Sequence, residues 1–172
     1  MEMAKRVSWI ALFVLVGVAS HWLPHLPNFS AFLAIALFAG FVLPSPVAML
    51  VAVGTVFLGD VLLGFHDLMW VVYLSLIPMV LVGGRLPKMQ GKGYATWAFA
   101  GLLSSVFFFF TTNLAVWWTS GMYPHTQAGL SECFVLALPF FHNSIMATWI
   151  FLGAFEGVRR LQPSRFPLAK QA

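Results

Sequence analysis

Six runs of apolar residues divide the chain, and short segments rich in proline, glycine and charged residues separate them. A helix that crosses a bilayer takes about 20 apolar residues. The pattern therefore predicts an all-α integral membrane protein with six transmembrane helices, folded as a single domain over residues 1–172. The predicted spans are 7–23, 29–43, 47–64, 68–84, 94–118 and 140–158.

The last apolar stretch, from Gly129 to Arg160, is too long for one span at a rise of about 1.5 Å per residue. Pro139 is expected to divide it, because proline is favoured at the first position of a helix and lacks the N–H that a helix interior uses. We therefore predict an outer loop with a short helix over 119–139, followed by the sixth span.

The start of the chain fits two interpretations. Lys5 and Arg6, an apolar core and the sequence Gly17-Val18-Ala19 resemble a cleavable signal peptide. The same run also serves as a first spanning helix, and we favour that interpretation.

Composition narrows the class of protein. Of the 172 residues, 60% are hydrophobic and 8% are charged, whereas soluble domains carry about 25% charged residues. A water-soluble enzyme is therefore excluded, and the single cysteine, Cys133, excludes a disulfide-built protein. Six spans leave no room for a soluble catalytic domain, and the sequence holds no phosphate loop and no hydrolase signature. We expect a protein that is not an enzyme.

The net charge of +4 is interpreted as a signal of topology and not of nucleic-acid binding. The basic residues fall before the first span, between the fourth and fifth spans and after the sixth: Lys5, Arg6, Arg85, Lys88, Lys92, Arg159, Arg160, Arg165 and Lys170. With six spans these groups share one side, which is cytoplasmic by the positive-inside rule. We predict that both termini are cytoplasmic and that nucleic acid is not a partner.

Polar residues gather at the opposite, outer side of this map. Asp60 is the most informative, because a carboxylate within a span costs about 2.5–3.5 kcal/mol at the centre and less near an end. It is either part of a pocket wall or a structural hydrogen-bonding group. The other candidate substrate-binding residues on this side are His25, Asn28, His66, Asp67, Asn113, Trp117, Tyr123, His142 and Asn143.

His66 is also a candidate metal ligand, since neutral imidazole binds transition metals and a carboxylate often orients it. Asp60 would take that orienting role if the chain folds back at Gly64. The alternative is a histidine wetted by solvent at the membrane interface. His21 and His25 have helical i, i+4 spacing, but a proline between them makes a two-histidine site a poor candidate.

Other features have structural interpretations. Trp117 belongs either to the aromatic belt of the membrane interface or to a pocket for a large planar ligand. Cys133 is either a soft ligand or a small buried hydrophobe. Glu156 is spaced to pair with the two arginines that follow it in the same helix. Small residues four apart, which let helices approach closely, occur at Ala36 and Gly40 and at Gly153 and Gly157.

Several segments form a distinctive set. They are Pro24-His25-Leu26-Pro27-Asn28-Phe29, Gly59-Asp60 through Gly64-Phe65-His66, Thr112-Asn113-Leu114-Ala115-Val116-Trp117, Tyr123-Pro124 with Gly129-Leu130, and Pro139-Phe140-Phe141-His142-Asn143. Over nearly the whole chain this set resembles a family of small membrane transport proteins, which is itself similar to the substrate-binding S components of energy-coupling factor (ECF) vitamin transporters.

The resemblance implies an S-component-like bundle of six helices in a bacterial inner membrane, with both termini inside. It also implies a vitamin pocket on the outer side, capped by the loops after spans one, three and five. Many S components dock a shared ECF transmembrane and ATPase module through Ala-xxx-Ala in the first helix. The first span here lacks that motif, which points to a solitary type.

The best-known solitary type is the cobalamin transporter family called BtuM, in which a cysteine near the outer end of the third helix binds cobalt. This chain has His66 in that region instead. The resemblance therefore implies His66 as an axial ligand to the cobalt of cobalamin or a related corrinoid. A nickel or cobalt ion carrier is disfavoured, because those S components resemble a Met-His start and this chain begins Met1-Glu2-Met3.

The leading hypothesis is thus a vitamin-uptake protein that binds cobalamin or a related corrinoid from the outer side. One alternative is an S-component-like carrier of a metal-free vitamin or another small micronutrient. The other is a membrane scaffold that organises an envelope complex. A membrane enzyme that uses Cys133 or a histidine is a more distant alternative.

Overall fold

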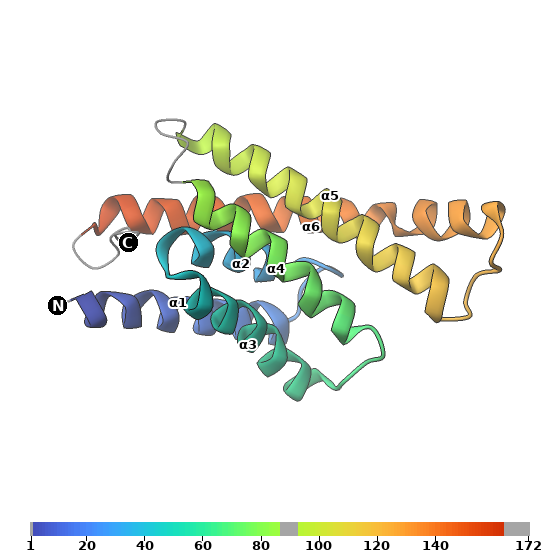
Figure 1. Cartoon of the computed structure of the whole chain (residues 1–172), viewed down its shortest axis with the longest axis horizontal. Helices are drawn as coiled ribbons and strands as arrows, with labels where there is room; N and C mark the ends of the chain where they lie inside the picture. Colours follow the sequence, from blue (N-terminus) through green and yellow to red (C-terminus); the bar gives the residue numbers. More distant parts are fainter. Residues whose placement is uncertain (1, 87–92, 164–172) are drawn as a thin grey trace.

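The computed structural model describes residues 2–86 and 93–163, where the regular structure is helical (Figure 1). The helices, in chain order, are α1 (Glu2–Trp22), α2 (Phe32–Val42), α3 (Ser45–Leu63), α4 (Met69–Arg85), α5 (Gly93–Thr119) and α6 (Gln127–Leu161). The prediction of an all-α fold with six helices is confirmed in these ranges. The predicted basic residues Lys88, Lys92, Arg165 and Lys170 lie outside them.

Three helices, α3, α5 and α6, are long and apolar enough to cross a membrane, judged by length and composition. The chain therefore has the character of a membrane protein. By contrast, the 11 residues of α2 extend about 16 Å, which is roughly half of a hydrocarbon core of about 30 Å. Six helices are thus found, whereas six complete spans stay a prediction.

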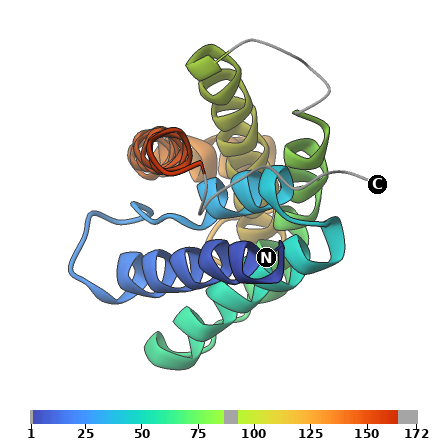
Figure 2. The ribbon, with the colours of Figure 1, turned by 90° about the vertical axis from the view of Figure 1, so that its left-hand side faces the viewer.

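Helix α2 lies at the centre of the bundle, and an end view shows the other helices around it (Figure 2). Its sequence is apolar on every side, and all its residues except Phe41 are buried, as expected for a helix without a polar face. It ends before Pro44, because the residue that precedes a proline is pushed to an extended conformation. Leu43 has φ −120° and ψ 156° accordingly.

Glycines bring α2 and α4 into backbone contact. A Cβ placed on Gly40 would lie 2.1 Å from the carbonyl oxygen of Val80, and one placed on Gly83 would lie 2.0 Å from the carbonyl oxygen of Leu37. The close approach predicted for Gly40 is therefore used within the chain. Gly153 and Gly157 behave differently, because an added Cβ would meet nothing within 4 Å.

An aromatic cluster joins four helices in the half of the bundle nearest the start of α1. The rings of Trp9 and Phe13 stack at 5.3 Å, Phe13 meets Phe155 of α6 edge-on at 5.2 Å, and Phe38 of α2 stacks on Trp97 of α5 at 4.8 Å. Such ring pairs add about 0.5–1.5 kcal/mol each beyond the burial of their area. They hold these four helices together at the end of the bundle where α1 begins.

The prediction that Pro139 ends one helix and begins another differs from the structure, in which α6 is continuous from Gln127 to Leu161. Phe109 of α5 explains how. Its ring lies 5.4 Å from the ring of Phe134, before the proline, and 4.6 Å from that of Phe141, after it. The packing of α6 against α5 both before and after Pro139 compensates for the one backbone hydrogen bond that the proline removes.

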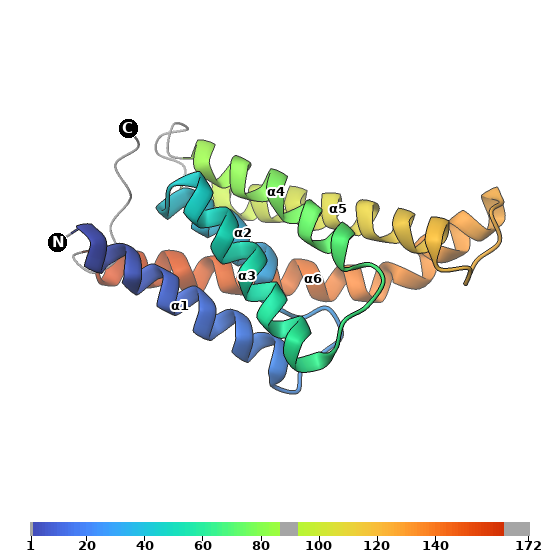
Figure 3. The same cartoon turned by 60° about the horizontal axis from the view of Figure 1, so that its bottom comes forward.

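Helix α1 begins and α6 ends at the same end of the bundle, where α4 also ends and α5 begins (Figure 1). Arg85, Arg159 and Arg160 therefore share this end. A second view shows α5 and α6 extending past the other four helices at the opposite end (Figure 3). The arrangement is compatible with termini on one side of a membrane, and the identity of that side stays a prediction.

The ion pairs predicted around Glu156 are confirmed. Its buried carboxylate accepts hydrogen bonds from Nε and Nη2 of Arg159, at 2.7 and 2.6 Å, and from Nε of Arg160, at 2.6 Å. The two guanidinium groups also lie over the rings of Phe41 and Tyr94. This cluster fastens the end of α6 to α2 and α5.

Candidate functional site

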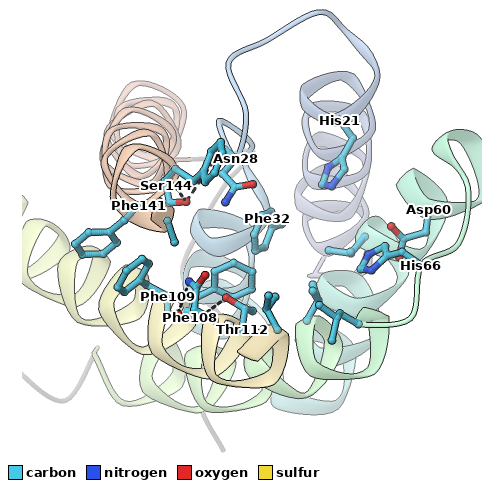
Figure 4. Close-up of a pocket in the computed structure, with 17 residues that line it drawn as sticks. His21, Asn28, Phe32, Asp60, His66, Phe108, Phe109, Thr112, Phe141 and Ser144 are labelled. Carbon is cyan, nitrogen blue, oxygen red and sulfur yellow. Dashed lines mark hydrogen bonds between the residues drawn. The ribbon is translucent and has the colours of Figure 1, made fainter. Parts of the chain in front are cut away.

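A cavity of about 330 Å³ lies where α1 and α3 end and α2 and α4 begin, against facing surfaces of α5 and α6. All six helices and the loops 23–31 and 64–68 contribute side chains to its wall. Its two sides differ (Figure 4): His21, Asp60 and His66 stand on one, and Asn28, Phe141 and Ser144 stand on the other. Phe32 and Phe108 lie between them.

Asp60 is in the last turn of α3 and is 7% exposed. The hydroxyl of Tyr73 on α4 donates a hydrogen bond to its Oδ2 at 2.5 Å. The backbone N–H of Gly64 bonds the carbonyl of Asp60 and ends the helix. Gly64 has φ +106° and ψ 148°, a conformation restricted essentially to glycine. Both interpretations of Asp60 thus hold together, since it lines the cavity and bonds a neighbouring helix.

Two histidines stand near Asp60. His21 lies half-buried in the last turn of α1, with its ring against Gly59 of α3. Its Nδ1 is shielded from solvent and makes no hydrogen bond in the described part of the chain. His66 is exposed at the cavity wall. The chain does fold back at Gly64, but within residues 2–86 and 93–163 no hydrogen bond or ion pair joins Asp60 to His66. Asp60 is oriented by Tyr73 instead.

The loop before α2 is tied to α6 across the opposite side of the cavity. Asn28 has φ +60°, which asparagine tolerates better than most residues. Its carbonyl accepts a hydrogen bond from Oγ of Ser144 at 3.5 Å, and Nδ2 of Asn143 donates to the carbonyl of Pro27 at 3.0 Å. These contacts place the Asn28 side chain at the cavity.

One face of α5 supplies polar groups beside aromatic ones. Nδ2 of Asn113 donates to the carbonyl of Phe109 at 2.7 Å, and Oγ1 of Thr112 donates to that of Phe108 at 2.7 Å. The side-chain oxygen of Asn113 is left to accept a further bond. The ring of Phe108 meets Phe32 edge-on at 5.0 Å. The cavity therefore combines aromatic surface with a few hydrogen-bonding groups, as ligand sites commonly do.

Four of the ten substrate-binding residues predicted from the sequence line the cavity: Asn28, Asp60, His66 and Asn113. The other six lie outside its wall: His25, Asp67, Trp117, Tyr123, His142 and Asn143. All of them except Tyr123 lie within three residues of a lining residue in the sequence. A helix turns by about 100° per residue, so a neighbour in sequence faces a different direction.

Several of these residues have another role. Nε1 of Trp117 donates to the carbonyl of Pro124 at 3.0 Å, and its ring contacts that of His125, which holds the loop between α5 and α6. Asn143 fastens the loop before α2, as described above. His25 is exposed and contacts the carbonyl of Leu26 at 2.7 Å through Nδ1. Asp67 and His142 are exposed, and Tyr123 is half-buried in the loop after α5.

Two lining stripes with helical spacing i, i+3, i+4, i+7 were not predicted from the sequence, apart from their one member Asn113. On α5 they are Phe109, Thr112, Asn113 and Val116, and on α6 they are Ala137, Phe140, Phe141 and Ser144. The spacing itself was a usable signal. Dividing the last helix at Pro139 hid the second stripe, because it separated the first of its members from the other three.

Cys133 has a packing role, and metal-ligating side chains do not gather in groups of three or more in the described ranges. Cys133 is buried, and its thiol donates to the carbonyl of Asn113 at 3.5 Å, so it packs as a small buried group. Across the described ranges, no group of three or more histidine, cysteine and acidic side chains could hold a metal ion.

Comparison with known families gives one match. A family of unknown function, DUF6580, matches residues 1–169. The chain belongs to DUF6580. No curated protein and no solved structure matches it.

Proposed function

We propose that this DUF6580 protein is the substrate-binding membrane component of an uptake system for a small, water-soluble micronutrient of the vitamin class. The cavity among the ends of α1–α4 carries the proposal, because every helix of the bundle contributes to its wall. Aromatic surface with a few convergent polar groups is the usual composition of a small-molecule site.

The size of the cavity favours a small ligand. Its volume of about 330 Å³ is near the lower end of the range of about 300–1,000 Å³ that holds drug-sized molecules. A metal-free vitamin or a similar micronutrient can be enclosed there. A corrinoid, with its large ring and amide side chains, would lie mostly outside.

The proposal includes an S-component-like bundle in a bacterial inner membrane, with the cavity open to the outside. Arg85 at the end of α4 and the two arginines in the last turn of α6 support this orientation, because they share the end where α1 begins. Turnover is then either solitary or driven by a shared ECF transmembrane and ATPase module. Uptake measured with and without that module separates the two modes.

A corrinoid is the second candidate, and the position of His66 favours it. The imidazole is exposed at the cavity wall, and within the described residues no hydrogen bond or ion pair occupies it. It can therefore reach a cobalt held at the mouth of the cavity. Hydroxocobalamin that co-elutes with the protein, with visible bands that shift in the wild type and not in His66→Ala, would establish this candidate; free elution would exclude it.

The test of the main proposal is a binding screen on the detergent-purified full chain. Water-soluble vitamins, hydroxocobalamin included, are added singly, and thermal unfolding is followed by tryptophan fluorescence. Ala137→Phe places a large ring in the cavity, whereas Ala154→Phe places the same ring on an exposed face of the same helix. We expect at least one vitamin to raise Tm in the wild type and Ala154→Phe but not in Ala137→Phe.

Other outcomes of the screen would overturn the proposal. Stabilisation that survives Ala137→Phe would place the ligand elsewhere. No stabilisation by any vitamin, together with a protein partner that co-purifies in stoichiometric amount, would support the scaffold alternative.

A further inference from the structure

The wall of the cavity contains one formally charged side chain, that of Asp60, among the described residues. No lysine or arginine occurs in residues 7–84 or 93–158 of the sequence. In the part of the chain that the structure describes, Arg85, Arg159 and Arg160 lie at the opposite end of the bundle. Asp67, in the loop after α3, is exposed and lies outside the cavity wall. The charge available at the site is therefore acidic.

Glu156, the other buried acid in the described ranges, is a carboxylate whose charge is paired. Glu156 is 2% exposed and pairs with two guanidinium groups. Asp60 is 7% exposed and has one hydroxyl partner, with no lysine, arginine or histidine nitrogen within 4.0 Å in the described ranges. A buried carboxylate without a counter-charge is costly, so such a position marks a place where a charged partner binds.

The helix ends around the cavity do not reverse this sign. The C-terminal ends of α1 and α3, which carry partial negative charge, face it together with the N-terminal ends of α2 and α4, which carry partial positive charge. The contributions of the four ends oppose one another. The full charge of Asp60 decides the preference.

The remaining walls suit the body of an organic cation. The rings of Phe109 and Phe141 pack at 4.6 Å, those of Phe32 and Phe108 meet edge-on at 5.0 Å, and all four line the cavity. Aromatic faces attract cations through the ring quadrupole and pack well against planar rings. Asn28 and Ser144, across from Asp60, add hydrogen-bonding groups for the far end of a ligand (Figure 4).

We propose that the ligand of this cavity is a small organic cation with an aromatic or apolar body, such as a protonated amine or an N-alkylated heteroaromatic ring. Its positive end pairs with Asp60, and its body lies along the phenylalanine walls. This inference rests on the proposed function and narrows the ligand to one charge class. Anionic micronutrients are excluded by the same carboxylate.

Three probes of nearly equal size test the charge directly: 2-phenylethylammonium, 2-phenylethanol and phenylacetate. Each is titrated into the purified full chain, and an apparent Kd is taken from the concentration dependence of Tm. Asp60→Asn removes the charge with little change in shape, and Asp67→Asn removes an exposed charge outside the cavity wall. The cavity-filling Ala137→Phe reports where each probe binds.

We expect the cation to bind about tenfold or more tightly than the neutral alcohol, and phenylacetate not to bind, since about 1.4 kcal/mol of added charge interaction gives a factor of ten. Asp60→Asn should remove that advantage, and Asp67→Asn should keep it. If Asp60→Asn does not fold, the ranking of the three probes on the wild type still decides.

Equal binding of the alcohol and the cation, tighter binding of phenylacetate, or an undiminished preference in Asp60→Asn would overturn the cation proposal. If, in any of these three cases, the probe no longer binds to Ala137→Phe, the proposed function stands and the ligand belongs to another charge class. Absence of any binding by 2-phenylethylammonium also overturns the cation proposal, and the vitamin screen then decides the proposed function by itself.

Discussion

The hydroxyl of Tyr73 lies 2.5 Å from Oδ2 of Asp60, so α4 holds this carboxylate, in the last turn of α3, at the wall of the cavity. Tyr73 itself does not line the cavity. The bond therefore links two helices across the loop that carries His66, and it orients the acid without occupying the space of a ligand.

Replacing Tyr73 by phenylalanine removes this bond and leaves the ring in place. A hydrogen bond to a charged group contributes about 1.5–3 kcal/mol, and we expect a loss of stability in that range. Thermal and denaturant unfolding of the detergent-purified variant measure it. Tyr123→Phe, in the loop after α5, is the matched control and should stay within about 0.5 kcal/mol of the wild type. Equal stabilities for the two variants would show that the bond contributes nothing.

A methyl group on Gly40 has no room, because it would overlap the backbone of Val80. We expect Gly40→Ala to lower the free energy of unfolding by about 1–3 kcal/mol, the usual cost of overpacking. Gly153→Ala places the same group in open space within a helix and should raise stability by about 0.5–1 kcal/mol. A Gly40→Ala variant as stable as the wild type would contradict the close crossing of α2 and α4.

The continuity of α6 through Pro139 predicts a distance. Ser131 and Ile150 are both exposed, and 19 residues of unbroken helix separate them by about 28 Å. Spin labels at cysteines introduced there, in a Cys133→Ser background, should give a single distance distribution centred near this value. A clearly shorter distance would restore the short outer helix, separate from the sixth span, that the proline pattern favours.

The Glu156 cluster predicts a contrast between two acids on one helix. Glu156→Ala leaves two arginines without their buried partner, and we expect a loss of about 1.5–3 kcal/mol. Glu132 is exposed, so Glu132→Ala should change stability by no more than about 0.5 kcal/mol. Unfolding curves of the two variants in the same detergent test this. Similar curves would mean that solvent screens the cluster at the bundle end.

Much of the architecture follows from local pattern. The apolar runs and the prolines and glycines between them place six helices, because each run can bury itself only as a helix in an apolar medium. The gathering of arginines at one end follows from counting helices. Asp60 is identified as a site candidate because a carboxylate in an apolar run needs a local reason.

Other features of the fold depend on contacts between segments that are far apart in the sequence. Phe109 contacts α6 on both sides of Pro139, and that contact keeps α6 whole against the local preference of the proline. The same continuity brings Ala137 and Ser144 onto one face with the residues between them, opposite the lining residues of α5.

The sequence by itself determined where the helices lie, that they are apolar enough for a membrane, and where the charged residues fall along the chain. These features depend on composition and on spacing within one segment. The tertiary structure alone decided which polar residues meet. Asn28, Asp60 and Ser144 come from three separate segments, whereas Trp117, His142 and Asn143 turn away although each neighbours a lining residue or lies one turn from it. The facing of a side chain is set by helix rotation, and contacts far apart in sequence fix that rotation.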